Sequence, residues 1–257
     1  MGQKIFISDQ RKIDLTSNYV IFVAKNMFMY RAEQDKCQGC ACISTPFRYM
    51  TPDELSYINR NRVDVQFRRG ESLCKEGIFA SSIYYIKEGL IKIFSEDLHG
   101  AVVLSVESRG YFLGLQALSS PHKYTYSATA FEDTQVCTLD INAFRKILVT
   151  NPLFATAIVR QLSKDTRKSF ERIATVGMKQ LHGRLADLLL CLAVRIYKSR
   201  EFTTSLGRKD MAEVTMMSQE SLSRVLKSFR DEGILSVHGK NFVIRDINTL
   251  RRISKTG

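Results

Sequence analysis

The sequence of 257 residues predicts an α+β chain in which a roll of short strands precedes a long helix and a winged helix-turn-helix. Three observations predict this order: short apolar segments separated by glycines up to Asp140, helical periodicity after Pro152, and two short helices followed by a hairpin near the end. We therefore expect four parts: an extension with a cysteine-rich loop over 1–50, a β-roll over 51–148, a long helix over 149–178 and the winged helix-turn-helix over 179–257.

The roll is predicted from period-two alternation and from its turns. Residues 63–67 alternate apolar and polar side chains, and glycines at 70, 77, 89, 100, 110 and 114 separate the segments that follow. Residues 83–86 and 90–94 flank Lys87-Glu88-Gly89, which is a typical hairpin signal. Further strands over 101–106, 124–130 and 135–139 are expected to complete an antiparallel barrel or roll.

The long helix begins at Pro152 and carries a stripe of apolar and small residues on one side. The stripe consists of Ile158, Leu162, Ser169, Ile173 and Val176. A stripe of this length can be buried against a second copy of the chain, which makes these residues the candidate dimer interface. It can also pack on the chain's own roll. Gly177 and Gly183 indicate a hinge before a second apolar-striped helix over 185–196.

The charge of the chain is unevenly distributed. Residues 1–159 contain 18 Lys and Arg against 16 Asp and Glu, whereas residues 160–257 contain 20 against 10. An excess of this kind in one domain favours a polyanionic partner, most often nucleic acid. No apolar run is long enough to cross a membrane and the start of the chain does not resemble a secretion signal, so we expect a cytoplasmic protein without a membrane partner.

The segment over 208–227 predicts a helix, a tight turn and a second helix. Ser218 is a suitable N-cap for the second helix. The outer side of that helix is expected to present Glu220, Ser221, Ser223, Arg224 and Lys227. Arginine can bind a guanine edge with two hydrogen bonds, glutamate can accept from a cytosine amine, and serine can bond a base or a phosphate. The strands expected over 234–244 form a wing, with Lys240 near its tip for a phosphate.

Glu220-Ser221-Leu222-Ser223-Arg224 resembles the Glu-x-x-Ser-Arg recognition helix of the Crp/Fnr family. The resemblance runs from about Cys37 to Ser254 and implies a cyclic-nucleotide-binding-like roll, a homodimer, and contact with RNA polymerase. It also implies that Glu220, Ser223 and Arg224 read double-stranded DNA with palindromic, TTGAT-like half-sites. One departure is Met216, which stands where the family often has a turn glycine, so we expect a strained positive φ there.

The resemblance also bears on the ligand of the roll. Family members that bind cyclic nucleotides use a glutamate for the ribose and an arginine for the cyclic phosphate. At the matching positions this chain has Leu115 and Tyr126. A cyclic phosphate without its arginine loses its main charge-assisted hydrogen bond. We therefore expect that cyclic AMP is not the effector.

The cysteines suggest another signal. Cys37, Cys40 and Cys42 lie within six residues, and Cys137 matches the fourth ligand of family members that hold a [4Fe–4S] cluster. The family's third loop cysteine would fall at Pro46, so Cys42 comes too early. The same thiols can hold zinc, act as redox-reactive groups or hold no cofactor, and a haem-based nitric-oxide sensor is a further alternative. Cys74 and Cys191 are expected to be structural.

The most direct functional interpretation is a dimeric, sequence-specific transcriptional regulator that responds to oxygen, nitric oxide or redox state. The alternative is a ligand-binding roll that regulates a protein partner without specific DNA binding. An enzyme is not expected, because the sequence has no nucleophile–base–orienter set, no Walker loop and no His-Glu-x-x-His motif.

Overall fold

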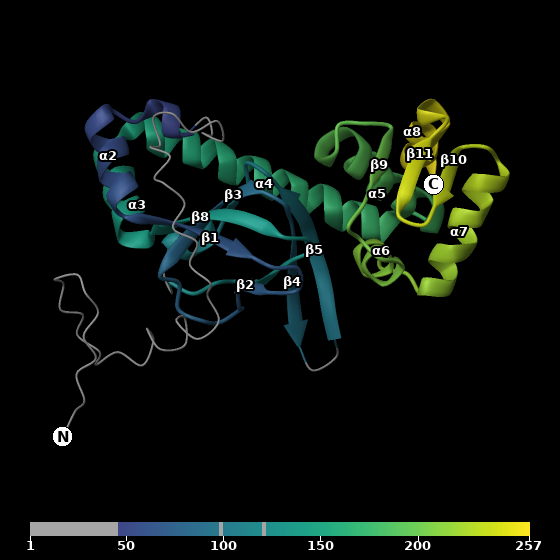
Figure 1. Cartoon of the computed structure of the whole chain (residues 1–257), viewed down its shortest axis with the longest axis horizontal. Coiled ribbons are helices and arrows are strands. Elements are labelled where there is room, and N and C mark those ends of the chain that lie inside the picture. Colours follow the sequence, from purple (N-terminus) through teal and green to yellow (C-terminus); the bar gives the residue numbers. More distant parts are fainter. Residues whose placement is uncertain (1–45, 98–99, 120–121) are drawn as a thin grey trace, which may run out of the picture. The chain divides into compact units, whose positions relative to one another are not determined.

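The computed structural model describes residues 46–97, 100–119 and 122–257 (Figure 1). A short 3-10 helix, η2 (Pro46–Tyr49), leads into α2 (Pro52–Arg60). Thr51 caps α2 by accepting a hydrogen bond from the backbone nitrogen of Glu54, whose carboxylate accepts from the backbone nitrogen of Thr51. This reciprocal capping box satisfies two amides at the start of the helix, so α2 begins at a defined residue.

The strands that follow form two four-stranded antiparallel sheets. Their bounds are β1 (Arg62–Phe67), β2 (Ser72–Cys74), β3 (Ser82–Glu88), β4 (Leu90–Asp97), β5 (Gly100–Ser108), β6 (Phe112–Leu113), β7 (Ser127–Ala130) and β8 (Thr134–Asp140). One sheet has the order β1-β8-β3-β6 and the other β2-β7-β4-β5, with a 3-10 helix η3 (Leu115–Leu118) after β6. The predicted roll is therefore confirmed.

The predicted hairpin between residues 83–86 and 90–94 is wrong. Strand β3 pairs with β8 and β6, whereas β4 pairs with β5 and β7, so the chain passes from one sheet to the other at Gly89. Gly89 has a φ of +99°, and a Cβ there would lie 2.4 Å from Thr134 Oγ1. The glycine is thus required by a close crossing of two chain segments. A turn signal fixes a change of direction but not the strand that each segment pairs with.

An aromatic cluster closes one end of the roll against the helices that follow it. Phe112 of β6 packs against Phe144 of α3 (Ile141–Thr150), with ring centroids 6.2 Å apart. Phe144 in turn lies 5.2 Å from Phe154, near the start of α4 (Pro152–Met178). All three side chains are at most 1% exposed. Burying a phenylalanine contributes about 1.5–3 kcal/mol, so this cluster fixes the start of α4 on the roll.

Helix α4 is a single helix of 27 residues, as its sequence predicts. Asn151 caps it by accepting from the backbone nitrogen of Phe154 at 2.9 Å, and Pro152 occupies the first helical position, where its missing N–H is not needed. The Asn151 amide also donates to the carbonyl of Tyr49 and to Glu54, which ties the helix start to η2 and α2.

The C-terminal part is a small helical domain with a three-stranded sheet. Its elements are α5 (Leu181–Leu190), a π-helix η4 (Cys191–Ile196), β9 (Glu201–Thr203), α6 (Arg208–Thr215), α7 (Gln219–Asp231), β10 (Leu235–His238), β11 (Asn241–Ile244) and α8 (Ile247–Thr256). The sheet has the order β10-β11-β9. Strand β9 and helix α8 were not expected from the sequence, because both are short and carry polar residues on their exposed sides. Within the described ranges, no helix is long and apolar enough to cross a membrane.

Candidate nucleic-acid interface and adjoining pocket

Helices α6 and α7 form the predicted helix-turn-helix. Asp210 accepts from the backbone nitrogen of Gly207 at 2.7 Å and so caps the start of α6. Met211 and Ala212 of α6 are buried, at 1% and 4% exposure. Ser218 caps α7 and accepts from the backbone nitrogen of Ser221 at 3.1 Å. Both helix starts therefore have defined first turns.

The turn between the helices is built on Met216. This residue adopts the left-handed conformation with φ +50° and ψ +53°, and the backbone nitrogen of Met217 donates to the carbonyl of Ala212. The expected positive φ is therefore confirmed. A side chain with a Cβ in this region costs about 1–2 kcal/mol, which the packing around α6 and α7 offsets.

Helix α7 presents a polar face to solvent. Leu222, Val225, Leu226 and Phe229 are buried, while Glu220, Ser223, Arg224 and Lys227 are exposed and Ser221 is half-buried. Arg224 lies 3.6 Å from Glu220 and donates to the hydroxyl of Ser221 at 3.2 Å. The Arg224 guanidinium is thereby oriented on the exposed side of the helix by two neighbours on the same turn. Side chains held in this way lose less conformational freedom when they bind.

The wing lies between β10 and β11. Its turn contains Gly239 with φ +61°, and Lys240 next to it is exposed. The third strand, β9, supports the wing, because Phe202 stacks on Phe242 with ring centroids 5.7 Å apart and an interplanar angle of 5°. The sequence did not predict this support, because β9 has only three residues.

Two family models match the chain over ranges that agree with these parts. The cyclic nucleotide-binding domain matches residues 64–151, and the Crp-like helix-turn-helix domain matches residues 183–253. Together they cover more than half of the chain, in the order expected. The chain belongs to the Crp/Fnr family.

Crp/Fnr relatives resemble this chain over most of its length. The anaerobic regulatory protein of Haemophilus influenzae is 26% identical over 229 residues, which cover 86% of this chain and 88% of that protein. The fumarate and nitrate reduction regulatory protein of Escherichia coli is 25% identical, over 85% of this chain and 90% of that protein. Among solved structures, FixK2 from Bradyrhizobium japonicum has a TM-score of 0.71 at 20% identity, covering 76% of this chain and 98% of that one. The chain is thus a Crp/Fnr-type transcriptional regulator with a DNA-binding helix-turn-helix.

In this Crp/Fnr chain, the Tyr126 side chain stands at the position expected to bind a cyclic phosphate, and its hydroxyl is hydrogen-bonded within the chain. The hydroxyl oxygen of Tyr126 accepts from the backbone nitrogen of Gly114 at 2.9 Å and donates to Gln116 Oε1 at 3.0 Å. Tyr126 is 6% exposed and Leu115 is 2% exposed. Burial raises the pKa of Tyr126, so the hydroxyl stays neutral. Neither side chain offers the positive charge that a phosphate requires.

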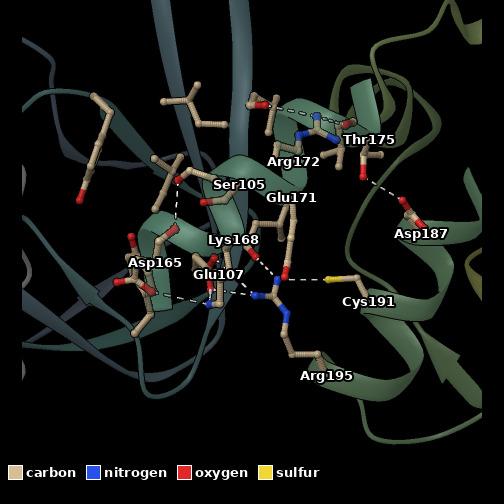
Figure 2. A pocket seen from close by; sticks show the side chains of 18 of the residues that line it. Ser105, Glu107, Asp165, Lys168, Glu171, Arg172, Thr175, Asp187, Cys191 and Arg195 are labelled. Carbon is tan, nitrogen blue, oxygen red and sulfur yellow. Dashed lines mark hydrogen bonds and ion pairs between the residues drawn. The ribbon is translucent and has the colours of Figure 1, made fainter. Parts of the chain in front are cut away.

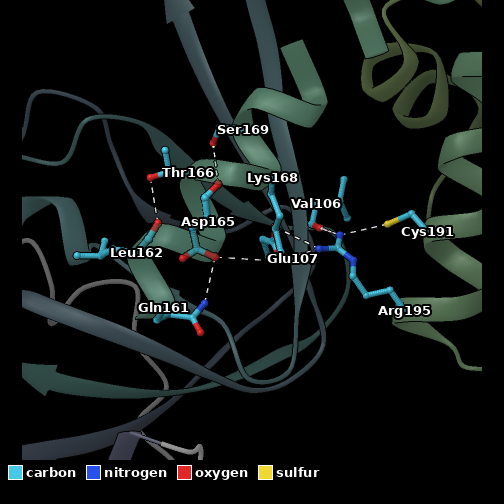
Figure 3. Close-up of polar contacts among 10 residues, drawn as sticks. All are labelled: Val106, Glu107, Gln161, Leu162, Asp165, Thr166, Lys168, Ser169, Cys191 and Arg195. Atoms are coloured by element: carbon cyan, nitrogen blue, oxygen red, sulfur yellow. Dashed lines mark hydrogen bonds and ion pairs between the residues drawn. The ribbon is translucent and has the colours of Figure 1, made fainter. Parts of the chain in front are cut away.

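A pocket of about 360 Å³ lies beside Tyr126 and extends along β5, α4, α5 and η4 (Figure 2). Its polar lining combines acids and bases, and Figure 3 shows the contacts among them. Glu107 is 5% exposed and lies 3.2 Å from Lys168 Nζ and 3.2 Å from Arg195 Nη1. Asp165 accepts from Gln161 at 3.0 Å. Burial raises the pKa of Asp165, an effect that the hydrogen bond from Gln161 and the charge of Lys168 oppose.

The candidate dimer residues on α4 lie on more than one side of the helix. Ile158 is 2% exposed and packs within its own chain, Leu162 and Val176 are half-buried, and Ser169 and Ile173 are exposed. The large apolar side chains that α4 does expose are Leu153, Val159, Phe170, Ile173 and Met178. Val159 and Phe170, which are exposed in the single chain, are the sequence neighbours of the predicted Ile158 and Ser169, and Ile173 belongs to both sets.

Of the candidate cluster ligands, Cys37, Cys40 and Cys42 lie outside the described residues. Cys137 is half-buried on β8, with its Sγ 3.6 Å from Arg62 Nη1. The same Arg62 nitrogen also lies 2.8 Å from Asp64 Oδ1, so the guanidinium is shared between the sulfur and a carboxylate. Cys74 is buried, and its burial raises the pKa of the thiol to about 12, which fits the predicted structural role. Cys191 is only half-buried and contacts Arg195 at 3.1 Å, so it borders the pocket rather than a core.

Proposed function

We propose that the chain is a homodimeric regulator that binds a palindromic DNA site through α7, in response to oxygen, nitric oxide or redox state rather than cyclic AMP. The observation that carries the proposal is the capped helix α7, on which Glu220, Ser223 and Arg224 are exposed side by side. By resemblance to the family, each half-site is TTGAT-like, and the bound dimer contacts RNA polymerase in the cytoplasm.

The three recognition residues differ in what they can offer to a base. Arg224 supplies two donors that fit the O6 and N7 of guanine. Glu220 can only accept, which suits a cytosine amine. The Ser223 hydroxyl donates to the carbonyl of Gln219 at 2.8 Å and therefore faces DNA as an acceptor. The exposed Ser218, Lys227 and Lys240 and the half-buried Ser221 are the candidates for phosphate contacts.

The test is binding of the full chain to a duplex with two TTGAT-like half-sites about 10 base pairs apart, followed by fluorescence anisotropy. We expect affinity at least about 10³-fold higher than for a scrambled duplex, with a steep loss as salt rises. Equal affinity for both duplexes, in protein prepared with and without oxygen, would contradict sequence-specific binding.

The dimer is proposed to form along the exposed seam of α4. Val159, Phe170 and Ile173 are each at least 60% exposed in the single chain and recur at the spacing of a helix–helix contact. An exposed apolar seam of this kind favours a second copy of the same helix. Ile173→Glu is expected to give a monomer in analytical ultracentrifugation, while Val149→Glu, at an exposed position on α3, is expected to leave the dimer intact. A dimer that survives Ile173→Glu would contradict this interface.

The signal is proposed to act through a [4Fe–4S] cluster held by Cys37, Cys40, Cys42 and Cys137. Support comes from the four thiols in the sequence, from the half-buried Cys137 on β8 and from the resemblance to oxygen-responsive family members. When bound, a cluster would supply a redox-sensitive centre next to the roll. The test is a visible spectrum with iron and acid-labile sulfide assays on protein purified without oxygen. About four irons per chain and loss of colour in air are expected, whereas iron-free protein would contradict the cluster.

A further inference from the structure

The carboxylate of Glu107 joins three elements that are far apart in the sequence. It lies on β5 of the roll and contacts Lys168 on α4 and Arg195 on η4 (Figure 2). Arg195 also donates to the backbone carbonyl of Val106 at 2.7 Å and contacts Cys191 Sγ. A single buried acid thus pairs with a cation from the long helix and with a cation from the DNA-binding domain.

The contact to η4 depends on an unusual backbone. Residues 191–196 form a π-helix, in which the backbone nitrogen of Tyr197 donates to the carbonyl of Leu192, five residues earlier, at 2.8 Å. Single π-turns within helices are rare and occur frequently at functional sites. Here the π-turn follows α5 directly and carries Arg195 toward Glu107.

Other contacts join the same parts of the chain through carboxylates that are more exposed. Lys92 on β4 lies 3.1 Å from Glu213 on α6, and Arg69 lies 3.5 Å from Asp210. Their side chains are 19–48% exposed, whereas the Glu107 side chain is 7% exposed. Solvent and salt screen exposed pairs far more than buried ones. Glu107 is therefore the least screened of these carboxylates.

A second contact, from a guanidinium to two backbone carbonyls, joins the same parts of the chain. Arg172 on α4 donates through Nη2 to the carbonyl of Val103 on β5 and to the carbonyl of Val214 on α6. Val214 lies in the first helix of the helix-turn-helix, two residues before Met216. The two cations Lys168 and Arg172 are four residues apart, so one face of α4 serves both the roll and the DNA-binding domain.

We propose that Glu107 is a positioning residue that holds the helix-turn-helix against the roll through Arg195 while it holds α4 through Lys168. Because Glu107, Lys168 and Arg195 all line the 360 Å³ pocket, a molecule bound there would contact these residues directly. A molecule that binds in the pocket would therefore alter the contacts of Glu107 and, through Arg195, the orientation of α7. The inference rests on the proposed function in one respect only, namely that the orientation of α7 affects DNA binding.

The test is hydrogen–deuterium exchange on the full chain without DNA, comparing wild type with Glu107→Gln. Glutamine keeps the size of the side chain but removes its charge, and Lys168 and Arg195 are 31% and 39% exposed, so water can solvate them. We expect exchange over α6 and η4 to rise about tenfold, equivalent to ~1.4 kcal/mol, with no change over β1 and β8. Unchanged exchange over α6 and η4 would overturn the proposal.

The matched control is Glu171→Gln. Glu171 also lines the pocket, but its carboxylate is 61% exposed and pairs with Arg167 on the same helix. This variant is expected to leave exchange over α6 and η4 unchanged, and an equal increase would overturn the proposal. DNA is absent from these measurements, so failure of the positioning role is distinguishable from failure of specific DNA binding.

A second variant separates positioning from a general loss of stability. Arg195→Gln leaves Glu107 paired with Lys168 and is expected to raise exchange over α6 and η4, as Glu107→Gln does. The double variant is then expected to raise exchange by less than the two single effects combined, because both changes remove the Glu107–Arg195 pair. Additive effects of the two changes would show that Glu107 and Arg195 act independently, and would overturn the proposal.

Discussion

The hydroxyl oxygen of Tyr126 lies 2.9 Å from the backbone nitrogen of Gly114, at the turn where a phosphate-binding roll would present its amides. Gly114 has a φ of +92°, so its N–H points along a direction that few other residues allow. The bond satisfies an amide that would otherwise be buried without a partner.

Tyr126→Phe is expected to destabilise the chain by about 1–3 kcal/mol, because the Gly114 amide loses its acceptor in a buried site. Urea unfolding followed by circular dichroism would measure this change. Tyr49→Phe, at an exposed tyrosine, is the control and is expected to change stability by less than about 0.5 kcal/mol. Equal stability of Tyr126→Phe and wild type would show that the Gly114 bond contributes nothing.

Met216→Gly is expected to stabilise the chain by about 1 kcal/mol, because glycine adopts a positive φ without a Cβ clash. The half-buried Met216 side chain makes contacts that are lost in the variant, so the gain is smaller than the full conformational cost. Met216→Ala removes the same contacts but keeps the clash, and it is expected to be no more stable than wild type. Thermal unfolding of the three proteins in parallel would decide between these outcomes.

Arg224→Ala is expected to remove about 1–3 kcal/mol of discrimination at one base pair of each half-site. Lys227→Ala, which removes a charge one turn further along α7, is expected to weaken binding to specific and scrambled duplexes alike and to reduce the salt dependence. Anisotropy titrations with single-base substitutions would measure both effects. If Arg224→Ala weakened all duplexes equally, its contact would be to phosphate only.

Asp165→Asn is expected to change how stability depends on pH. Burial raises the pKa of Asp165 in the folded chain, so the folded state binds a proton more readily than the unfolded state. The resulting stability is present at acid pH and is lost as the pH rises through the folded pKa. Asparagine cannot ionise, so relative to wild type the variant should gain stability as the pH rises from about 4 to about 8.

Urea midpoints at several pH values would measure the Asp165→Asn effect. The groups that face Asp165 include Gln161 and Lys168 on α4 and Glu107 on β5, and these remain in the variant. Glu171→Gln, at an exposed acid on the same helix, is the control and is expected to follow wild type across this range. A constant difference between Asp165→Asn and wild type at all pH values would contradict the raised pKa.

The helix-turn-helix could be predicted from interactions between residues that are close in the sequence. Ser218 as N-cap and the positive φ of Met216 depend on neighbours within a few residues, and the structure confirms both. The start of α4 at Pro152 was predictable for the same reason.

Features that depend on distant partners were not predictable. The hairpin signal at Gly89 could not reveal that β3 and β4 belong to different sheets, because strand pairing is decided by the whole roll. Glu107 was not singled out, since Arg195 lies 88 residues away and neither residue is part of a motif. The burial of Ile158 within its own chain was not predictable either, because a helical period cannot tell which of two adjacent faces is covered.

The π-helix between Cys191 and Ile196 has a consequence for how tolerant the chain is to changes in length. In an α-helix each residue turns the chain by about 100°, so a deletion within 191–196 that restored regular α-helical bonding would rotate Arg195 away from Glu107. Substitutions of apolar residues in this segment would leave that direction intact. Insertions or deletions in this segment would therefore disturb the contact between Arg195 and Glu107 more than exchanges of its apolar side chains would.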